Sequence, residues 1–174
     1  MFSYILFDLD GTVSDPKAGI TGSVQYALHA LGIEEPDLDR LEPFIGPPLR
    51  DSFQEYYNLN EEQTEFAVKK YRERFCAKGI YENILYPGMK ELLNRLKESG
   101  CHLAVASSKL EVSVTEILRY FAIGDCFEVT VGSEPDGRRS KKEEVVEEAL
   151  HRFFTDGKIP FDDIVMVGDR KFDI

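Results

Sequence analysis

The segment Tyr4-Ile5-Leu6-Phe7-Asp8-Leu9-Asp10-Gly11-Thr12, close to the N-terminus, decides how this chain folds. Its apolar first half predicts a buried β-strand, which runs into two carboxylates and a glycine turn. Because residues two apart on a strand point to the same face, Asp8 and Asp10 can converge on one point. The segment therefore predicts a strand that delivers two acids to a tight turn.

A second strand of the same kind lies near the other end of the chain. The apolar run Asp163-Ile164-Val165-Met166-Val167 leads into Gly168-Asp169-Arg170-Lys171-Phe172-Asp173. Two strands that deliver acids from opposite ends of the chain indicate a divalent metal held between carboxylates. One of these carboxylates would then be free to act as a nucleophile.

The apolar residues between these two strands follow two different spacings. From residue 15 to residue 86 the spacing is helical, with Asp15-Pro16 expected to cap the first helix, and no convincing strand is present. After Pro87-Gly88, apolar strands expected at 102–106 and 126–131 alternate with amphipathic helices. Such alternation predicts a parallel sheet with crossover helices, and ligands of these sheets bind beyond the carboxyl ends of the strands.

Composition and charge exclude several classes of protein. The 174 residues are 43% hydrophobic and 30% charged, which is ordinary for one globular core with a small inserted domain. The net charge of -11 argues against nucleic acid or an anionic membrane as a partner. It also repels phosphorylated substrates at long range, so any phosphate site must be locally cationic.

Cysteine usage and the N-terminal sequence predict where the protein works. Cys76, Cys101 and Cys126 are odd in number and widely spaced, which indicates thiols in a reducing compartment rather than disulfides or a zinc site. The chain begins without a signal-peptide pattern, and no apolar stretch approaches the ~20 residues that span a bilayer. We therefore expect a cytoplasmic protein.

The two acidic motifs resemble those of the haloacid dehalogenase superfamily. Asp8–Thr12 reads Asp-x-Asp-Gly-Thr and Gly168–Asp173 reads Gly-Asp-x-x-x-Asp, as in the first and fourth motifs of that superfamily. Most members are magnesium-dependent phosphatases, and the overall plan most resembles the phosphoglycolate phosphatase-like branch. The resemblance implies a Rossmann-like α/β core formed by residues 1–14 and 87–174, with an α-helical cap inserted at residues 15–86.

The chain departs from this plan at its C-terminus. The chain stops at Ile174, just after the fourth motif, whereas relatives of this plan continue with a helix and a further strand. We therefore expect the C-terminal part of the core to be missing.

The resemblance also implies roles for the acids. Asp8 would be the nucleophile that forms an aspartyl-phosphate, and Asp10 would protonate the leaving alcohol and then deprotonate the attacking water. Mg²⁺ would be held by Asp8, by the backbone carbonyl of Asp10 and by Asp169, with Asp173 in support.

Residues that bind the transferring phosphate are implied in three further places. One is a lysine that neutralises the phosphate and the nucleophile, and two adjacent lysines fit. The spacing of the motif lysine from Asp136-Gly137 and from the Glu-Val pair that follows favours Lys142, and Lys141 is the alternative. The other implied phosphate-binding residues are Gly11 and Thr12 in the first motif, and Ser107 and Ser108 in the second.

The helical insertion would close over the strand ends and carry the contacts that select the substrate. The loop Phe44-Ile45-Gly46-Pro47-Pro48-Leu49-Arg50 resembles the cap loop that dips toward the active site in this branch. Arg50 is therefore a candidate to bind a second anion of the substrate, and Lys109 is another. The expected substrate is a small phosphorylated metabolite like phosphoglycolate, and a 5′-nucleotidase is the alternative.

Two other classes of protein fit the residues less well. A dehalogenase within the same superfamily does not need the second acid of the first motif, so Asp10 argues against it. A non-catalytic phospho-accepting module also gathers acids, a hydroxyl and a lysine at strand ends. Such a module lacks an insertion between its first two strands, whereas this chain has one of about seventy residues, much longer than the usual connection between strands. The sequence does not determine the oligomeric state.

Overall fold

The computed structural model describes residues 2–139, 141–155 and 157–170. The chain divides into two compact units. The first unit combines Met1–Asp15 with Leu85–Ile174, and the second is Pro16–Ile84. No helix in the described ranges has both the length and the apolar character needed to cross a membrane.

A parallel sheet with the strand order β5-β4-β1-β6 forms the centre of the first unit. β1 (Tyr4–Phe7) lies between β4 (His102–Leu110) and β6 (Ile164–Val167), and β5 (Val129–Ser133) lies at the edge beside β4. The chain moves from β1 through β4 to β5 and then crosses back to β6. Because the strand order reverses at β1, the carboxyl end of β1 is where a sheet of this kind binds its ligand.

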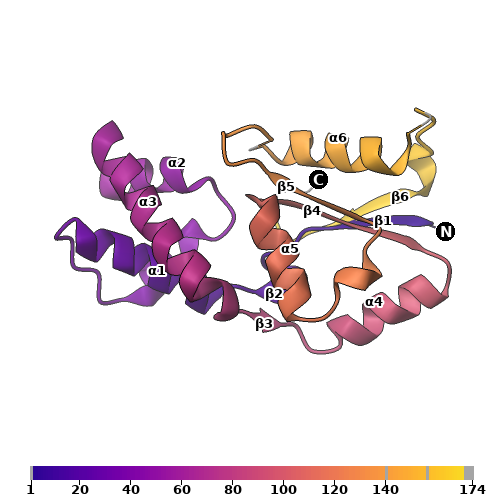
Figure 1. Ribbon diagram of the computed structural model, residues 1–174, viewed down its shortest axis with the longest axis horizontal. Coiled ribbons are helices and arrows are strands. Elements are labelled where there is room, and N and C mark those ends of the chain that lie inside the picture. The colour runs from indigo at the N-terminus through magenta and orange to yellow at the C-terminus, as the bar shows by residue number, and fades with distance from the viewer. Residues whose placement is uncertain (1, 140, 156, 171–174) are drawn as a thin grey trace. The chain divides into compact units, whose positions relative to one another are not determined.

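Helices cover both faces of this sheet (Figure 1). α6 (Lys142–Phe153) lies on one face, and α4 (Met89–Glu98) and α5 (Glu111–Tyr120) lie on the other. Strand alternation explains the division, because every second side chain points toward α6. The core on that face consists of Leu6, Ala104, Ala106, Val129, Val131, Val145 and Ala149. The predicted parallel α/β core is thus confirmed.

The second unit is helical. α1 (Lys17–Ala30) packs along α3 (Glu61–Ala77), and buried apolar residues such as Val24 and Phe53 form its core. Its other elements are α2 (Leu49–Tyr57) and two 3-10 helices, η1 (Leu38–Phe44) and η2 (Gly79–Tyr81). The remaining elements of the chain are β2 (Ser14–Asp15), which pairs with β3 (Ile84–Leu85), and the 3-10 helices η3 (Gly124–Cys126) and η4 (Phe161–Asp163).

The structure corrects several local predictions. β2 and β3 were missed because two-residue strands are too short to show an alternating pattern. Asp15 does not cap the first helix: it belongs to β2, and α1 follows Pro16 without a side-chain cap from the described residues. β4 continues to Leu110 instead of ending at Ala106, because a register shift lets its pairing with β5 resume at Leu110 and Ser133.

Gly132 marks the point where β5 passes closest to the start of α5. A Cβ atom at this position would lie 2.5 Å from the N and Cα of Glu111 and from the carbonyl oxygen of Lys109. These are backbone atoms, so they cannot rotate away. We expect Gly132→Ala to lower the free energy of unfolding by about 2–3 kcal/mol, measured by urea denaturation.

Gly124→Ala is the matched control for this substitution. The nearest atom that its Cβ would meet is the Cβ of Leu118 at 4.0 Å, an ordinary van der Waals distance. Its free energy of unfolding should stay within about 0.5 kcal/mol of the wild-type value. Equal losses in the two variants would contradict the close approach at Gly132.

Candidate active site

The register of the sheet brings the ends of its strands to one place. Phe7 is level with Val105 of β4 and with Val167 of β6. The residues that follow these three therefore lie along the carboxyl edge, where the N–H of Asp8 donates to the carbonyl of Val167 at 2.9 Å. The acids and hydroxyls predicted after β1, β4 and β6 share this edge.

Asp8 is paired with Lys142 at the centre of the edge. Asp8 follows Leu6 by two residues and so stays on the face that α6 covers, and Lys142 is the first residue of α6. The Nζ of Lys142 lies 2.8 Å from Oδ1 of Asp8 and donates to the carbonyl of Ala106 at 3.0 Å. The Lys142 and Asp8 side chains are only 9% and 10% exposed.

Burial dominates the electrostatics of Asp8. It raises the pKa of the Asp8 carboxyl above the ordinary value of 3.8. The positive charge and hydrogen bond of Lys142 oppose this rise in pKa, whereas the negative charge of Asp10 adds to it. Lys142 therefore contributes most to favouring the ionised form of Asp8, and the backbone N–H of Leu9 adds to it.

The structure distinguishes the two candidate lysines. Lys142 reaches Asp8, whereas Lys141 is exposed at the start of α6, where its backbone N–H donates to Oε2 of Glu144 at 3.2 Å. Only a side chain that starts on the sheet side of α6 can extend toward β1. The geometry thus favours Lys142, as the motif spacing does.

Asp10 is also paired with a lysine. The Nζ of Lys109, predicted to contact the substrate, lies 2.8 Å from Oδ2 of Asp10, and the Lys109 and Asp10 side chains are 9% and 10% exposed. The other carboxylate oxygen, Oδ1, is buried and lacks a hydrogen-bond partner within the described part of the chain. Asp10 is therefore oriented through one oxygen and offers the other to a ligand.

The turn after Asp10 is compact because Gly11 adopts a φ of 87°, which glycine tolerates far better than other residues. Its N–H donates to the carbonyl of Ser14 at 2.8 Å, and the N–H of Thr12 donates to the carbonyl of Leu9 at 3.3 Å. A Cβ atom at Gly11 would lie 2.5 Å from Oδ2 of Asp169. The missing side chain thus lets the Asp169 carboxylate lie against the turn.

The oxygen atoms expected to hold Mg²⁺ belong to this turn or lie next to it. The backbone carbonyl of Asp10 is part of the turn, Asp8 precedes Asp10 by two residues, and the Asp169 carboxylate lies against Gly11. The residues that the structure describes contain no cluster of three or more His, Cys, Asp or Glu side chains placed to hold a metal. Mg²⁺ is usually bound by one or two carboxylates together with water, so this donor set fits it. Asp173 lies outside the described residues.

The two serines predicted to bind phosphate lie on β4. Ser107 is buried, with only 2% of its surface exposed, and its Oγ accepts the N–H of Lys109 at 3.4 Å. Ser108 is half-buried beside it. Ser107 therefore lies in the same segment as the lysine that pairs with Asp10.

Tyr86 lies near the site but was missed from the sequence. Its N–H donates to the carbonyl of Val13 at 3.2 Å, which holds it beside the first loop. Burial raises the pKa of the Tyr86 hydroxyl, and the negative charges of Asp15 and Asp169 raise it further. A single tyrosine before a Pro-Gly pair belongs to no motif, so no sequence pattern could have identified it.

Arg50, predicted to bind a second anion of the substrate, lies on α2 in the helical unit. Its guanidinium pairs with Glu61 and, at 2.9 Å, with Oε1 of Glu65, both on α3. These ion pairs hold α2 against α3. The predicted contact between Arg50 and the substrate stays a prediction.

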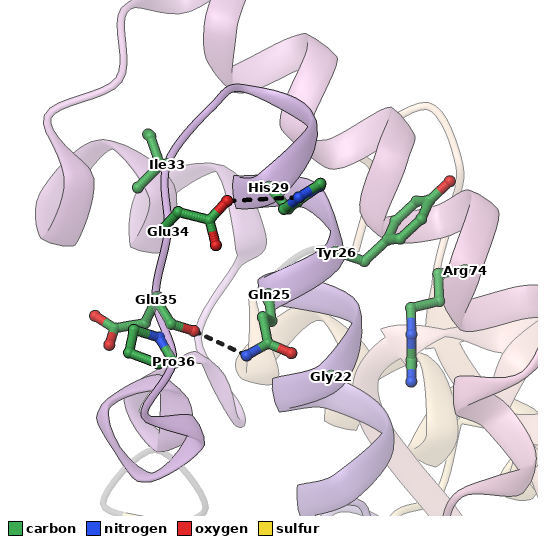
Figure 2. Close-up of a pocket in the computed structure, with 9 residues that line it drawn as sticks. All are labelled: Gly22, Gln25, Tyr26, His29, Ile33, Glu34, Glu35, Pro36 and Arg74. Atoms are coloured by element: carbon green, nitrogen blue, oxygen red, sulfur yellow. Dashed lines mark hydrogen bonds and ion pairs between the residues drawn. The ribbon is translucent and has the colours of Figure 1, made fainter.

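The helical unit also contains a cavity of about 420 Å³ beside α1 (Figure 2). Two interactions join residues of its lining: the amide of Gln25 donates to the carbonyl of Glu35 at 2.8 Å, and Nε2 of His29 lies 3.4 Å from Oε1 of Glu34. The residues that line it are Gly22, Gln25, Tyr26, His29, Ile33, Glu34, Glu35, Pro36 and Arg74. None of these described residues was predicted to belong to the active site.

Known proteins are similar to this chain in sequence and in fold. The family model for haloacid dehalogenase-like hydrolases matches residues 5–174. A 5′-nucleotidase of Pseudomonas aeruginosa is 48% identical over 170 residues, which cover 98% of this chain and 75% of that protein. The crystal structure of a predicted phosphatase from Clostridium acetobutylicum has a TM-score of 0.92 and 45% identity, with coverage of 99% of this chain and 78% of that one.

More distant relatives bear other names. Tyrosine-protein kinase PtkA of Mycobacterium tuberculosis is 38% identical over 98% of this chain, which spans 56% of that protein. A phosphoglycolate phosphatase of Aquifex aeolicus is 30% identical over 98% of this chain, which spans 77% of that protein. The chain thus spans between about half and three quarters of the length of the relatives it matches.

Proposed function

Because the chain belongs to the haloacid dehalogenase-like hydrolase family, we propose that it is a magnesium-dependent phosphatase that hydrolyses a small phosphomonoester. The observation that carries this proposal is the buried pair of Asp8 and Lys142 at the carboxyl end of the central strand. It supplies a carboxylate nucleophile together with a fixed positive charge.

In the first step, a carboxylate oxygen of Asp8 attacks phosphorus and the bond to the leaving alcohol breaks, which gives an aspartyl-phosphate. Lys142 keeps the carboxylate ionised, and its ammonium also offsets the negative charge on the phosphoryl oxygens. Phosphoryl transfer depends mainly on such positioning and charge neutralisation. A buried ammonium is effective because little water screens its charge.

Asp10 acts as the general acid in the first step and as the general base in the second. It gives a proton to the leaving alcohol in the first step. In the second step it takes a proton from a water molecule that attacks phosphorus, the bond between phosphorus and the Asp8 oxygen breaks, and inorganic phosphate leaves. Lys109 fixes one oxygen of Asp10, while the buried oxygen without a described partner is the one offered to the alcohol or the water. This orientation supports a role for Lys109 beside the reacting atoms, in addition to its predicted contact with the substrate.

Magnesium, when bound, neutralises charge on the transferring phosphoryl group. The carboxylates of Asp8 and Asp169 and the carbonyl of Asp10 would hold it, and a supporting role for Asp173 belongs to the same proposal. The phosphate itself would be bound by Gly11, Thr12, Ser107 and Ser108.

We further propose that the helical unit, Pro16–Ile84, acts as a cap that excludes water and selects the substrate. The 5′-nucleotidase relative is 48% identical and the phosphoglycolate phosphatase relative 30%, which supports nucleoside monophosphates as substrates more strongly than phosphoglycolate. A small phosphorylated metabolite as partner and a cytoplasmic location complete the proposal.

The test is phosphate release from para-nitrophenyl phosphate, measured with Mg²⁺, with EDTA, and after Mg²⁺ is added back to the EDTA-treated protein. We expect turnover that EDTA abolishes and Mg²⁺ restores. The same assay then compares kcat/KM for nucleoside monophosphates, phosphoglycolate, pyrophosphate and sugar phosphates. Folded, magnesium-loaded protein without any turnover would contradict the proposed phosphatase, and turnover that resists EDTA would contradict its metal dependence.

A further inference from the structure

Lys142 lies at the end of the loop that joins β5 to α6, of which the structure describes residues 134–139 and Lys141. Because Lys142 is the first residue of α6, it is the helical residue nearest to this loop, and a shift of the loop would be felt first at Lys142. The loop bends at Gly137, with a φ of 90°, and at Arg139, with a φ of 54°. Residues other than glycine rarely adopt a positive φ, so contacts around Arg139 must hold it there.

The guanidinium of Arg139 supplies such contacts to three segments of the chain. Its Nη2 lies 2.8 Å from Oε1 of Glu134, at the start of the loop, and 3.2 Å from Oε2 of Glu111, at the start of α5. Its Nη1 lies 3.2 Å from Oε1 of Glu148, in α6. The Arg139 side chain is 19% exposed, so water screens these ion pairs only partly.

Glu111 links the Arg139 ion pairs to the central sheet. Glu111 directly follows Leu110, the last residue of β4, and its Oε2 also accepts the N–H of Gly132 in β5 at 3.2 Å. Arg139 therefore connects the loop that delivers Lys142 to the strand that carries Ser107 and Lys109.

A second arginine keeps the surrounding carboxylates in place. Arg152 donates to Oε1 of Glu148 at 2.8 Å, to Glu111 and, at 2.8 Å, to the carbonyl of Thr130 in β5. Arg152, assisted by Arg139, holds the pKa of Glu148 below its usual range. Glu111 and Glu148 thus keep a partner when Arg139 is removed, whereas the loop loses its link to both.

The neighbouring Arg138 provides a contrast. Its side chain is 71% exposed and pairs with Asp136 at 2.7 Å and with Glu134, both of which belong to the same loop. Arg138 therefore braces the loop internally, while Arg139 braces it against the helices on either side.

From this arrangement we propose that Arg139 is a positioning residue that holds Lys142 in place against Asp8. The catalytic consequence rests on the proposed phosphatase function. The position of the Lys142 side chain does not depend on that function, so the two claims can be tested separately.

The first test measures the accessibility of individual lysines by acetic anhydride labelling and mass spectrometry. We expect Arg139→Gln to raise the labelling rate of Lys142 several-fold and to leave that of Lys109 unchanged. The two lysine side chains are equally buried, at 9% exposure, but Lys109 belongs to β4, whereas Lys142 follows the loop at the start of α6. Arg138→Gln should change neither rate. Equal rises at both lysines, or no rise at Lys142, would overturn the proposal.

The second test is a double-mutant cycle on phosphate release. Arg139→Gln should lower kcat by about 10-fold with little change in KM, because a small displacement of a catalytic group slows the chemical step. In a Lys142→Ala background it should have no further effect on kcat. A purely structural role would lower kcat by the same factor in both backgrounds, and that result would overturn the proposal.

These two measurements separate the failure of the proposal from the failure of the proposed function. If the wild-type protein showed no phosphate release, the proposed function would be wrong. Lysine labelling would still decide whether Arg139 holds Lys142.

Discussion

Asp8→Asn is expected to abolish phosphate release, lowering kcat by at least ~10³-fold. An amide has nearly the shape of a carboxylate, but it carries no negative charge to attack phosphorus and cannot form the acyl phosphate. The substitution also removes the ion pair between Asp8 and the Lys142 ammonium, which is only 9% exposed. The measurement is phosphate release from para-nitrophenyl phosphate at saturating Mg²⁺.

Asp125→Asn is the matched control. Asp125 is exposed in η3, away from the carboxyl edge of the sheet, and its kcat should equal the wild-type value. Circular dichroism and thermal unfolding establish that both variants are folded. More than about a tenth of wild-type activity in folded Asp8→Asn would exclude Asp8 as the nucleophile.

The stability of Asp8→Asn is also expected to depend on pH differently from that of the wild type. Burial raises the pKa of Asp8 in the folded protein above the ordinary value of 3.8, so the folded state binds this proton more tightly than the unfolded state. The ionised carboxylate therefore lowers stability as pH rises through 3.8, and the penalty is complete above the raised pKa. An amide carries no such penalty. In urea denaturation, the free energy of unfolding of Asp8→Asn minus that of the wild type should increase as the pH rises from about 3 to 7.

Lys142→Ala is expected to lower kcat by about 10²–10³-fold, the usual cost of removing one group that stabilises charge in the transition state. Its ammonium lies 2.8 Å from Oδ1 of Asp8, the proposed nucleophile, and both side chains are largely buried. KM should change less than kcat, because the charge on the phosphoryl oxygens is best neutralised while the phosphoryl group is being transferred. Steady-state kinetics with para-nitrophenyl phosphate measures both constants.

Lys141→Ala is the control for this prediction. Lys141 is adjacent in sequence, has the same charge and is exposed at the start of α6. Its kcat should remain within about 2-fold of the wild-type value, since a surface charge in water contributes little. The reverse result, a large loss with Lys141→Ala alone, would assign the motif lysine to position 141.

Much of the site was predictable because its acids belong to local patterns. Asp8 and Asp169 each follow a short apolar run, and such runs in an α/β alternation become neighbouring parallel strands. The carboxyl ends of parallel strands meet at one edge, so the motif positions alone placed these acids together. The match of residues 5–174 to the family confirms the predicted superfamily.

The contacts between the site residues were not predictable in the same way. The sequence placed Lys109 after an expected strand end, but β4 continues to Leu110 and its register shifts, which brings the Lys109 ammonium onto Asp10. Tyr86 lies outside the motifs, and Arg139 lies in the stretch that contains the motif lysine but has no role implied there. Long-range ion pairs of this kind depend on helix and loop directions that no periodic pattern records.

By itself, the sequence determined the family, the parallel α/β core and the acids at its carboxyl edge, because strand alternation and glycine turns act over a few neighbouring residues. Only the tertiary structure decided that Lys109 pairs with Asp10 and Arg139 with carboxylates from three segments, and it brought Lys142, the lysine favoured by the motif spacing, to 2.8 Å from Asp8. The reason is physical. An ion pair requires two side-chain ends to meet within a few ångströms, and that distance is set by how whole strands and helices pack.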